Sequence, residues 1–335
     1  MQISPLIFEP ILKPKIWGGQ RLAEVANKRL PPGERIGESW EVADLEDDQS
    51  VVAAGPAKGQ TLGELVTRWE GDLIGNAELF QGRFPLLIKY LDAQDNLSVQ
   101  VHPDTAMAER LGGSVRIKNE AWYVLHAQPG GCIYRGLADG VTREQFAAAI
   151  EQGTCAALLN RIPVQPGQCY YLPSGTVHAL GAGVVVAEIQ TPSDVTYRVF
   201  DWNRVDPATG KPRRLHIDEA MECIDFSHRP IHGEERSHVA TVWTTVTRLV
   251  TCDSFIIERV NMIEGYDQDI PYGQLVVWMV LAGEGNIGFD DGRGRLDFGR
   301  GDTVVLPAGL KDARLTTRAD CTWLEVTLPA GGSRR

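Results

Sequence analysis

Short apolar runs separated by Gly, Pro and Asp make up most of the chain, and this pattern predicts β structure. Runs of this kind, alternating or fully apolar and bounded by turn residues, are typical of strands. We predict strands at residues 86–91, 97–102, 121–125, 169–173, 184–190, 255–260, 275–282 and 303–307. Many short strands with few helices indicate a mainly all-β fold, built as a sandwich or a barrel.

Two stretches have a helical pattern instead, residues 61–69 and 142–161. At the start of the second stretch, Thr142 and Gln145 match a capping box, in which each side chain bonds to the backbone of the other residue. Gly153 interrupts this stretch and is expected to split it, because glycine weakens a helix interior.

An internal repeat is visible in the strand-rich part of the chain. Residues 167–178 read GQCYYLPSGTVH and residues 301–312 read GDTVVLPAGLKD, so both follow the pattern G-x5-P-x-G-x2. Upstream, 120-EAWYVL-125 matches 276-VVWMVL-281 with a larger offset, which an insertion near 142–161 explains. Such a repeat indicates two copies of one β module.

The repeat predicts the domain organisation. We expect a catalytic, metal-binding module at residues 1–235, with the helical insertion near 142–161, and a degenerate copy at 236–335. The first copy, which ends in a histidine, resembles the second motif of the cupin superfamily, whose fold is a double-sheet jelly roll. Two cupin-type jelly-roll modules with a few short helices are therefore the predicted fold.

Composition narrows the functional classes. The chain has 335 residues, 43% of them hydrophobic and 23% charged, which is typical of a globular protein. Its formal charge of −11 argues against a nucleic-acid partner, which needs a basic stripe. We find no long apolar run and no secretory pattern at the N-terminus, so no membrane partner is expected. The six cysteines form no CxxC pair, which indicates reduced thiols and a cytoplasmic location.

Four residues form a candidate metal site in the first copy: Gln100, His102, Glu120 and His178. Gln100 and His102 are two apart on a predicted strand, so their side chains share a face. Two imidazoles, a carboxylate and an amide oxygen can hold one divalent ion, with zinc as the first expectation and ferrous iron as the alternative. The competing interpretation is a set of satisfied buried polar groups, and Gln100 has the further alternative of holding a bound water.

The second copy has lost these ligands. Asp312 occupies the position of His178, and Val276 occupies the position of Glu120. We therefore expect the C-terminal module to bind no metal and to act structurally, by packing on the first module or shaping its cleft.

Six segments together resemble a narrower family, the short form of type I mannose-6-phosphate isomerase (phosphomannose isomerase). They are LKPKIWGG at 12–19, IGESWEVAD at 36–44, LSVQVHPD at 97–104, KNEAWYVL at 118–125, LPSGTVHALGAG at 172–183 and EIQTPSDVTYRVFDW at 188–202. The helical domain of the longer family members is absent. The resemblance implies zinc-dependent interconversion of mannose 6-phosphate and fructose 6-phosphate.

The resemblance also implies roles for individual residues. It makes the four candidate ligands the metal site, makes Lys118, Glu188 and Arg198 active-site residues, and places Ser98 near the substrate. Oligomeric state stays open between monomer and dimer.

Isomerisation through an enediol needs a polarised carbonyl, a stabilised oxyanion and a proton shuttle. Arg198 suits the oxyanion or the phosphate, because its charge is permanent and its donors form a planar fork. Lys118 is two residues before Glu120, so on a strand it shares the face of that ligand; a solvated surface lysine is the alternative. The base stays open between Glu188, Lys118, Asp194, His178 and a metal-bound water, with a shuttle near Lys118 and Glu188 favoured.

Further residues are candidates for substrate contacts. Arg204, six residues past Arg198, suits the phosphate, with a surface ion pair as the alternative. Trp17 and Glu41 suit the sugar, because an aromatic face and a carboxylate match a polyol, with core packing as the alternative for the tryptophan. Asp194 is expected to orient Arg198.

Three classes of function compete. The isomerase is favoured over another cupin enzyme, either a different sugar isomerase or an iron-dependent oxygenase, because a fold does not decide chemistry. A non-catalytic sugar-phosphate-binding regulator is the third class, and the intact ligand set of the first copy argues against it.

Overall fold

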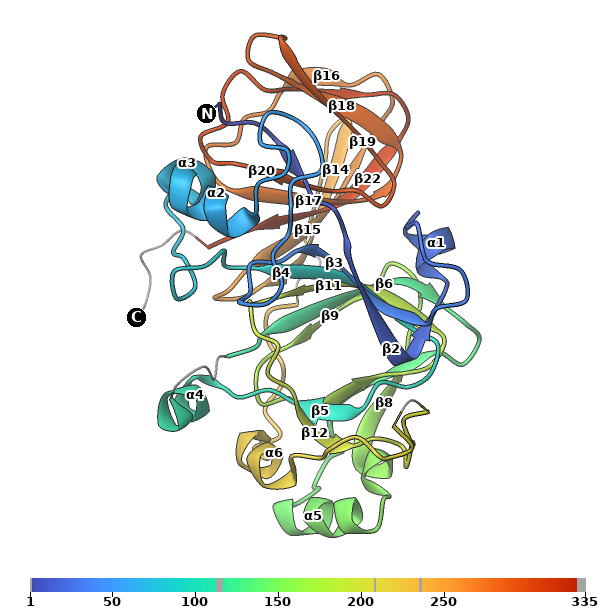
Figure 1. Cartoon of the computed structure of the whole chain (residues 1–335). Helices are drawn as coiled ribbons and strands as arrows, with labels where there is room; N and C mark the ends of the chain where they lie inside the picture. The colour runs from blue at the N-terminus through green and yellow to red at the C-terminus, as the bar shows by residue number, and fades with distance from the viewer. Residues whose placement is uncertain (1, 113–116, 208, 235–236, 330–335) are drawn as a thin grey trace.

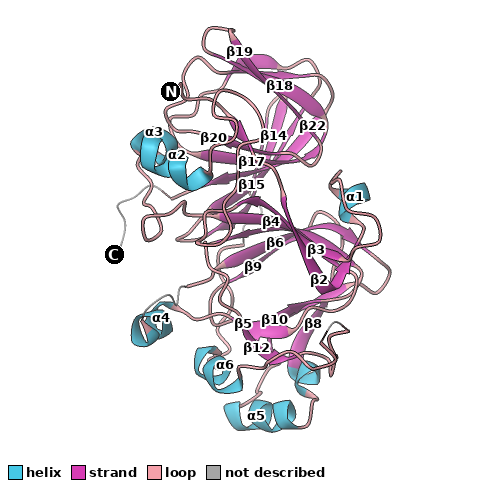
Figure 2. Cartoon of the chain, in the orientation of Figure 1, coloured by secondary structure: helices cyan, strands magenta, loops and turns pink. Residues whose placement is uncertain are grey.

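The structure is a computed structural model that describes residues 2–112, 117–207, 209–234 and 237–329. It confirms the mainly β fold, with strands through the middle of the molecule and short helices around its edge (Figure 2). Two β modules are stacked on one another, and the C-terminal strands build the upper one in Figure 1. Within the described residues, no helix has the length and apolarity to span a membrane.

The first module consists of two sheets that face each other. The six-stranded sheet has the order β2 (Ile11–Gly19), β3 (Ile36–Val42), β4 (Leu87–Ala93), β11 (Val184–Gln190), β6 (Glu120–Ala127) and β9 (Cys169–Leu172). The five-stranded sheet has the order β12 (Tyr197–Phe200), β5 (Val99–Val101), β10 (His178–Leu180), β7 (Cys132–Leu137) and β8 (Leu159–Pro163).

The second module repeats this plan. Its seven-stranded sheet has the order β1 (Leu6–Ile7), β20 (Thr303–Leu306), β17 (Val276–Ala282), β22 (Cys321–Thr327), β15 (Ile256–Met262), β14 (Thr244–Thr251) and β13 (His238–Ala240). Its four-stranded sheet has the order β16 (Asp267–Asp269), β21 (Arg314–Thr317), β18 (Glu284–Phe289) and β19 (Gly294–Gly299). Every strand predicted from the sequence has its counterpart in these sheets.

Both helical predictions are confirmed. The helices are α1 (Leu22–Val25), α2 (Leu62–Trp69), α3 (Gly71–Ile74), α4 (Thr105–Leu111), α5 (Arg143–Glu151) and α6 (Ile217–Cys223), with a 3-10 turn at Cys155–Leu158. Thr142 and Gln145 form the expected capping box on α5. Gly153 splits the stretch at φ +68°, a left-handed conformation that glycine adopts readily. The residues after the 3-10 turn belong to β8 rather than to a helix.

The two large sheets share one strand order, because β4, β11, β6 and β9 correspond to β15, β22, β17 and β20. A tryptophan faces a glutamate at the same place in both sheets: Trp122 lies opposite Glu188, and Trp278 lies opposite Glu325. The two indoles donate to these carboxylates at 2.8 and 3.1 Å. The repeat in the sequence is therefore a repeat of the fold.

The six-stranded sheet is buried on both faces. On β6, Trp122 and Val124 face the interior of the first module. The alternate residues Ala121 and Tyr123 join a large apolar cluster that also contains Val277 of the second module. Since side chains alternate along a strand, one face of this sheet builds the first barrel and the other binds the second module.

The interior of the second barrel is filled with aromatic side chains. Trp278 and Trp323 are each 1% exposed, and their ring centroids lie 4.7 Å apart. Phe298 packs edge-on against Trp278. Val276, at the position of Glu120, belongs to the same apolar cluster. Apolar packing thus occupies the place that the polar ligands hold in the first module.

The first strand of the chain crosses to the second module, where Leu6 of β1 pairs with Val305 of β20. The proposed 1–235 module therefore contributes a strand to the sheet of the other one. The predicted boundary itself, at residues 235 and 236, lies outside the described residues and stays a prediction.

Candidate active site

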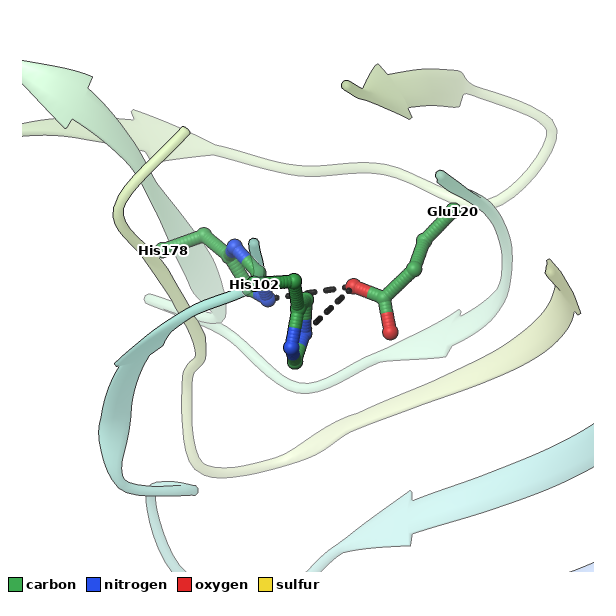
Figure 3. A group of neighbouring side chains, drawn as sticks. All are labelled: His102, Glu120 and His178. Carbon is green, nitrogen blue, oxygen red and sulfur yellow. Dashed lines mark ion pairs between the residues drawn. The ribbon is translucent and has the colours of Figure 1, made fainter. Parts of the chain in front are cut away.

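His102, Glu120 and His178 meet between the two sheets of the first module (Figure 3). β5 and β10 are neighbours in the five-stranded sheet, and His178 pairs with Gln100. Glu120 opens β6 in the opposite sheet. One ligand atom from each of the three residues lies within 4.8 Å of the other two. The fold therefore brings two imidazoles and a carboxylate together at one point.

Backbone carbonyls orient both imidazoles. His102 Nδ1 lies 2.8 Å from the carbonyl of Val195, and His178 Nδ1 lies 2.8 Å from the carbonyl of Thr176. Each Nδ1 therefore donates a hydrogen bond to its carbonyl, which turns each Nε2 toward Glu120. Burial, with repulsion from Lys118, lowers the pKa of His102 to about 4, so this imidazole is neutral at pH 7, as a metal ligand must be.

Glu120 is fully buried and lies close to nitrogen atoms of three side chains. Its Oε2 is 3.1 Å from His178 Nε2 and 3.4 Å from His102 Nε2, and its Oε1 is 2.5 Å from Lys118 Nζ. Burial raises the pKa of Glu120, but attraction to Lys118 outweighs burial and holds the pKa well below its usual range. Neither carboxylate oxygen has a well-aligned hydrogen bond within the described part of the chain.

These features fit a divalent metal. A buried carboxylate whose oxygens lack aligned hydrogen bonds is costly unless another group satisfies it. Two imidazoles with Nε2 turned toward the carboxylate complete a set of two nitrogens and one oxygen, which suits zinc or ferrous iron. Gln100 is next to the group, with its Nε2 3.4 Å from His178 Nε2, where an inverted amide would present its oxygen instead.

A polar cavity of about 250 Å³ adjoins the metal group. Seven of the residues predicted for the site line it: Trp17, Ser98, Gln100, Lys118, Glu188, Asp194 and Arg198. Lys118 contacts both the cavity and Glu120, which places the metal group at the cavity wall. A second cavity, of about 370 Å³, lies between α3 and the loop before β17, and none of its lining residues is charged.

The structure does not bring Glu41 and Arg204 to this cavity. Glu41 points to the opposite side of β3, where it accepts from Lys28 Nζ at 2.6 Å. Arg204 donates to Asp201 and to the backbone carbonyl of Asn96, both at 2.5 Å. For Arg204, the alternative of an ion pair describes the observed contacts.

Several lining residues were missed: Lys15, Glu38, Lys89, Arg213 and His216. Lys89 Nζ lies 3.3 Å from Glu188 Oε1 and 3.8 Å from Glu38 Oε2, and these charged side chains are nearly fully buried. A signal existed for Lys89, because it is a charge in the middle of the apolar run LLIKYL. Choosing Glu41 over Glu38 was an error of strand face, since residues three apart on a strand point to opposite sides.

The fold and the site define a class: a two-module, cupin-type β protein with a His/Glu/His metal-binding group. Residues 6–129 match the family described as phosphomannose isomerase type I, catalytic domain. The mannose-6-phosphate isomerase ManA of Bacillus subtilis is 37% identical over 96% of this chain and 98% of its own length. A mannose-6-phosphate isomerase of Streptococcus mutans is 35% identical over 92% of this chain and 94% of its own.

Solved structures agree. The crystal structure of the mannose 6-phosphate isomerase from Bacillus subtilis superposes with a TM-score of 0.86 and 31% identity, covering 97% of this chain and all of that one. The chain belongs to the type I phosphomannose isomerase family, as its sequence motifs indicated.

Proposed function

We propose that this protein interconverts mannose 6-phosphate and fructose 6-phosphate, using one divalent metal ion held by His102, Glu120, His178 and Gln100. The observation that carries this proposal is that the His/Glu/His group lies next to a polar cavity, because Lys118 and Gln100 line the cavity and contact Glu120 and His178. Such a metal, zinc by preference, would polarise the substrate carbonyl and stabilise the enediolate oxygen.

The proton shuttle is assigned to Glu188 and Lys118, which both line the cavity. Burial raises the pKa of Glu188, although attraction to Lys89 opposes the shift. A carboxylate with a raised pKa is a better base at neutral pH, because it holds the abstracted proton more firmly. Trp122 Nε1, at 2.8 Å, and Lys89 fix the orientation of Glu188.

Lys118 is placed to act on a substrate oxygen. Its Nζ lies 2.5 Å from Glu120 and 3.4 Å from His102, at the border between metal group and cavity. The ammonium can donate to a hydroxyl or an oxyanion of the sugar while staying paired with Glu120. Asp194, also in the cavity wall, is the remaining alternative for the base.

Arg198 lines the cavity from β12. Its Nε donates to Ser98 Oγ at 3.2 Å and its Nη1 to the carbonyl of Arg214 at 3.0 Å, so the guanidinium is held in place by neutral groups. The cation thus keeps its full charge for a substrate anion.

We also infer a cytoplasmic location, supported by six cysteines that form no disulfide.

The test is direct. The protein is purified, stripped with a chelator, reloaded with zinc or iron, and assayed for fructose 6-phosphate formed from mannose 6-phosphate. Turnover that is lost on stripping and restored by zinc is expected. Absence of turnover in the reloaded protein would sink the proposal, and oxygen consumption with iron would favour the oxygenase.

A further inference from the structure

Strand β13 forms one edge of the seven-stranded sheet, and all of its residues are exposed. The chain around it, 237-SHVATVWTTV-246, contains no Lys, Arg, Asp or Glu, in a protein in which 23% of the residues are charged. Large apolar side chains are exposed along this hairpin: Val239 at 65%, Val242 at 82% and Trp243 at 51%. This edge of the second module is therefore both apolar and open to solvent.

The other edge strands have the features by which proteins prevent edge-to-edge association. A charge or a proline on an edge strand opposes its pairing with another chain. Within the described residues, five edge strands have one: β2 has Pro14, β8 has Arg161, β12 has Arg198, β16 has Asp267 and β19 has Arg295. The edge strands β1 and β9 have none, but they are largely buried. In the described part of the chain, β13 is thus the exposed edge without such protection.

The pairing of β13 with β14 determines which backbone groups face outward. Backbone bonds to β14 are made on both sides of Val239, at Ser237 and at Thr241, with N···O distances of 2.9 and 2.8 Å. Hydrogen-bonded pairs alternate along an antiparallel ladder, so Val239 also bonds to β14. His238 and Ala240 therefore direct their N–H donors and C=O acceptors away from the sheet.

This edge is complementary to itself. When two β13 strands meet antiparallel across a two-fold axis centred on Val239, His238 of each copy lies opposite Ala240 of the other. These are the residues with outward backbone groups, so each such pair exchanges both of its N–H···O=C bonds. The two Val239 side chains then form a non-hydrogen-bonded pair, in which side chains lie closest. A second copy also brings an uncharged strand, so no like-charge pair arises between chains that each have a formal charge of −11.

We propose that β13 is an interface between two copies of this chain, which join their seven-stranded sheets into one continuous sheet. Because the strand is short, the contact is small, and we expect a dimer with a dissociation constant in the micromolar range. No residue of β13 lines the active-site cavity, so pairing leaves that cavity open in each copy.

The test uses two opposite charges at Val239. Analytical ultracentrifugation of the unmodified protein from about 1 to 200 µM should show a dimer that forms as the concentration rises. Val239→Lys and Val239→Glu should each stay monomeric, because two like charges would lie opposite one another. An equimolar mixture of the two variants should restore the dimer. Val205→Lys, which adds the same charge at an exposed valine outside the hairpin, is the control and should dimerise like the unmodified protein.

A monomer at every concentration would overturn the proposal. So would a dimer that persists in Val239→Lys, because another surface would then hold the copies together. Loss of the dimer in both variants without recovery in the mixture would overturn the two-fold pairing centred on Val239. Should the charge variants fail to fold, Ala240→Pro removes an outward N–H without removing a bond to β14, and an undiminished dimer in that variant would overturn the proposal. Sedimentation needs no turnover, so these outcomes are independent of the proposed function.

Discussion

Each residue of the His/Glu/His group depends on a neighbour that is not itself a ligand. The carbonyls of Val195 and Thr176 fix the imidazoles, and Lys118 keeps Glu120 ionised. Such neighbours orient the ligands, and their loss lowers the affinity for the metal.

The first prediction separates metal binding from catalysis. His102→Ala and Glu120→Ala each remove one of three converging ligands, so bound metal should fall to background by elemental analysis. Arg198→Ala should keep its metal and lose activity about a hundredfold, because only a substrate contact is removed. His126→Ala, which removes an imidazole elsewhere on β6, is the control and should retain both. Full activity in Arg198→Ala would show that its assigned role is wrong.

Glu38 gives a prediction about pH. Burial would raise its pKa, but attraction to Lys89 and Lys15 outweighs burial and lowers the pKa to about 2, against an ordinary value of 4.5. Because the folded-state pKa is the lower one, ionised Glu38 stabilises the fold above about pH 4.5, and this contribution disappears as the pH falls toward 2. The stability difference between the unmodified protein and Glu38→Gln should therefore shrink across that window.

Melting temperatures of both proteins at about pH 6 and in steps below it measure this difference. Glu46→Gln, at an exposed position, serves as the control and should show little difference at any pH. A gap between wild type and Glu38→Gln that stays constant down to pH 2 would contradict the assigned pKa.

Much of the site followed from the sequence, because family motifs and the strand spacing of Gln100 and His102 named the residues around the metal. The rest depended on facts that the sequence does not contain. Strand face decided between Glu38 and Glu41, and the return of the chain after β12 brought Arg213 to the cavity. Neither the register of β3 nor the path of that loop is visible in a local pattern.

At the scale of elements, sequence patterns that reflect backbone hydrogen bonding, such as the capping box of α5, predicted the structure correctly. A second capping box begins α2. Thr61 Oγ1 accepts from the backbone N–H of Glu64 at 3.2 Å, and Glu64 Oε2 accepts from the backbone N–H of Thr61 at 2.8 Å. The apolar face of α2 packs on the large cluster between the modules. Strand pairing, by contrast, joins segments far apart in the chain, so the order of the sheets could not be predicted from the runs alone.

The cap of α2 can be tested by Thr61→Ala. Loss of the side-chain bond should cost about 1 kcal/mol of unfolding free energy without changing activity, since no residue of α2 lines the cavity. Thr67→Ala makes the same chemical change in the middle of α2. Because alanine has a higher helix propensity than threonine, the free energy of unfolding should stay equal or rise slightly. Denaturant unfolding monitored by circular dichroism measures both. Equal losses at the two positions would argue against a stabilising cap.

At the scale of the whole molecule, the largest apolar cluster lies between the two modules. It joins alternate residues of β11, such as Ala187 and Ile189, to Leu324 and Val326 of β22. The sequence repeat predicted two modules, but it did not show that they share a core, because alternation alone does not say what covers the second face. The modules should therefore unfold together in one cooperative transition.

Gly301 tests this contact between modules. It adopts φ +93°, and a Cβ atom there would lie 2.0 Å from the carbonyl oxygen of Ala26 in the first module. Gly292 has a similar φ of +80° with no atom within 4 Å of a Cβ, so Gly292→Ala carries only the strain of the left-handed backbone, about 1–2 kcal/mol. Gly301→Ala should cost clearly more, measured by thermal unfolding. Equal costs would show that the modules tolerate separation at this point.

The two-sided burial of the six-stranded sheet has a consequence for how the enzyme can change. On β6 and β11, Trp122 and Glu188 each stand between two residues of the apolar cluster that joins the modules. A substitution that shifts those strands to suit a new sugar therefore also weakens the packing between the modules. Within the described residues, the five-stranded sheet and the loop carrying Arg213 contribute no residue to that cluster. Directed evolution toward other substrates should accumulate its successful changes there, leaving the shared sheet almost untouched.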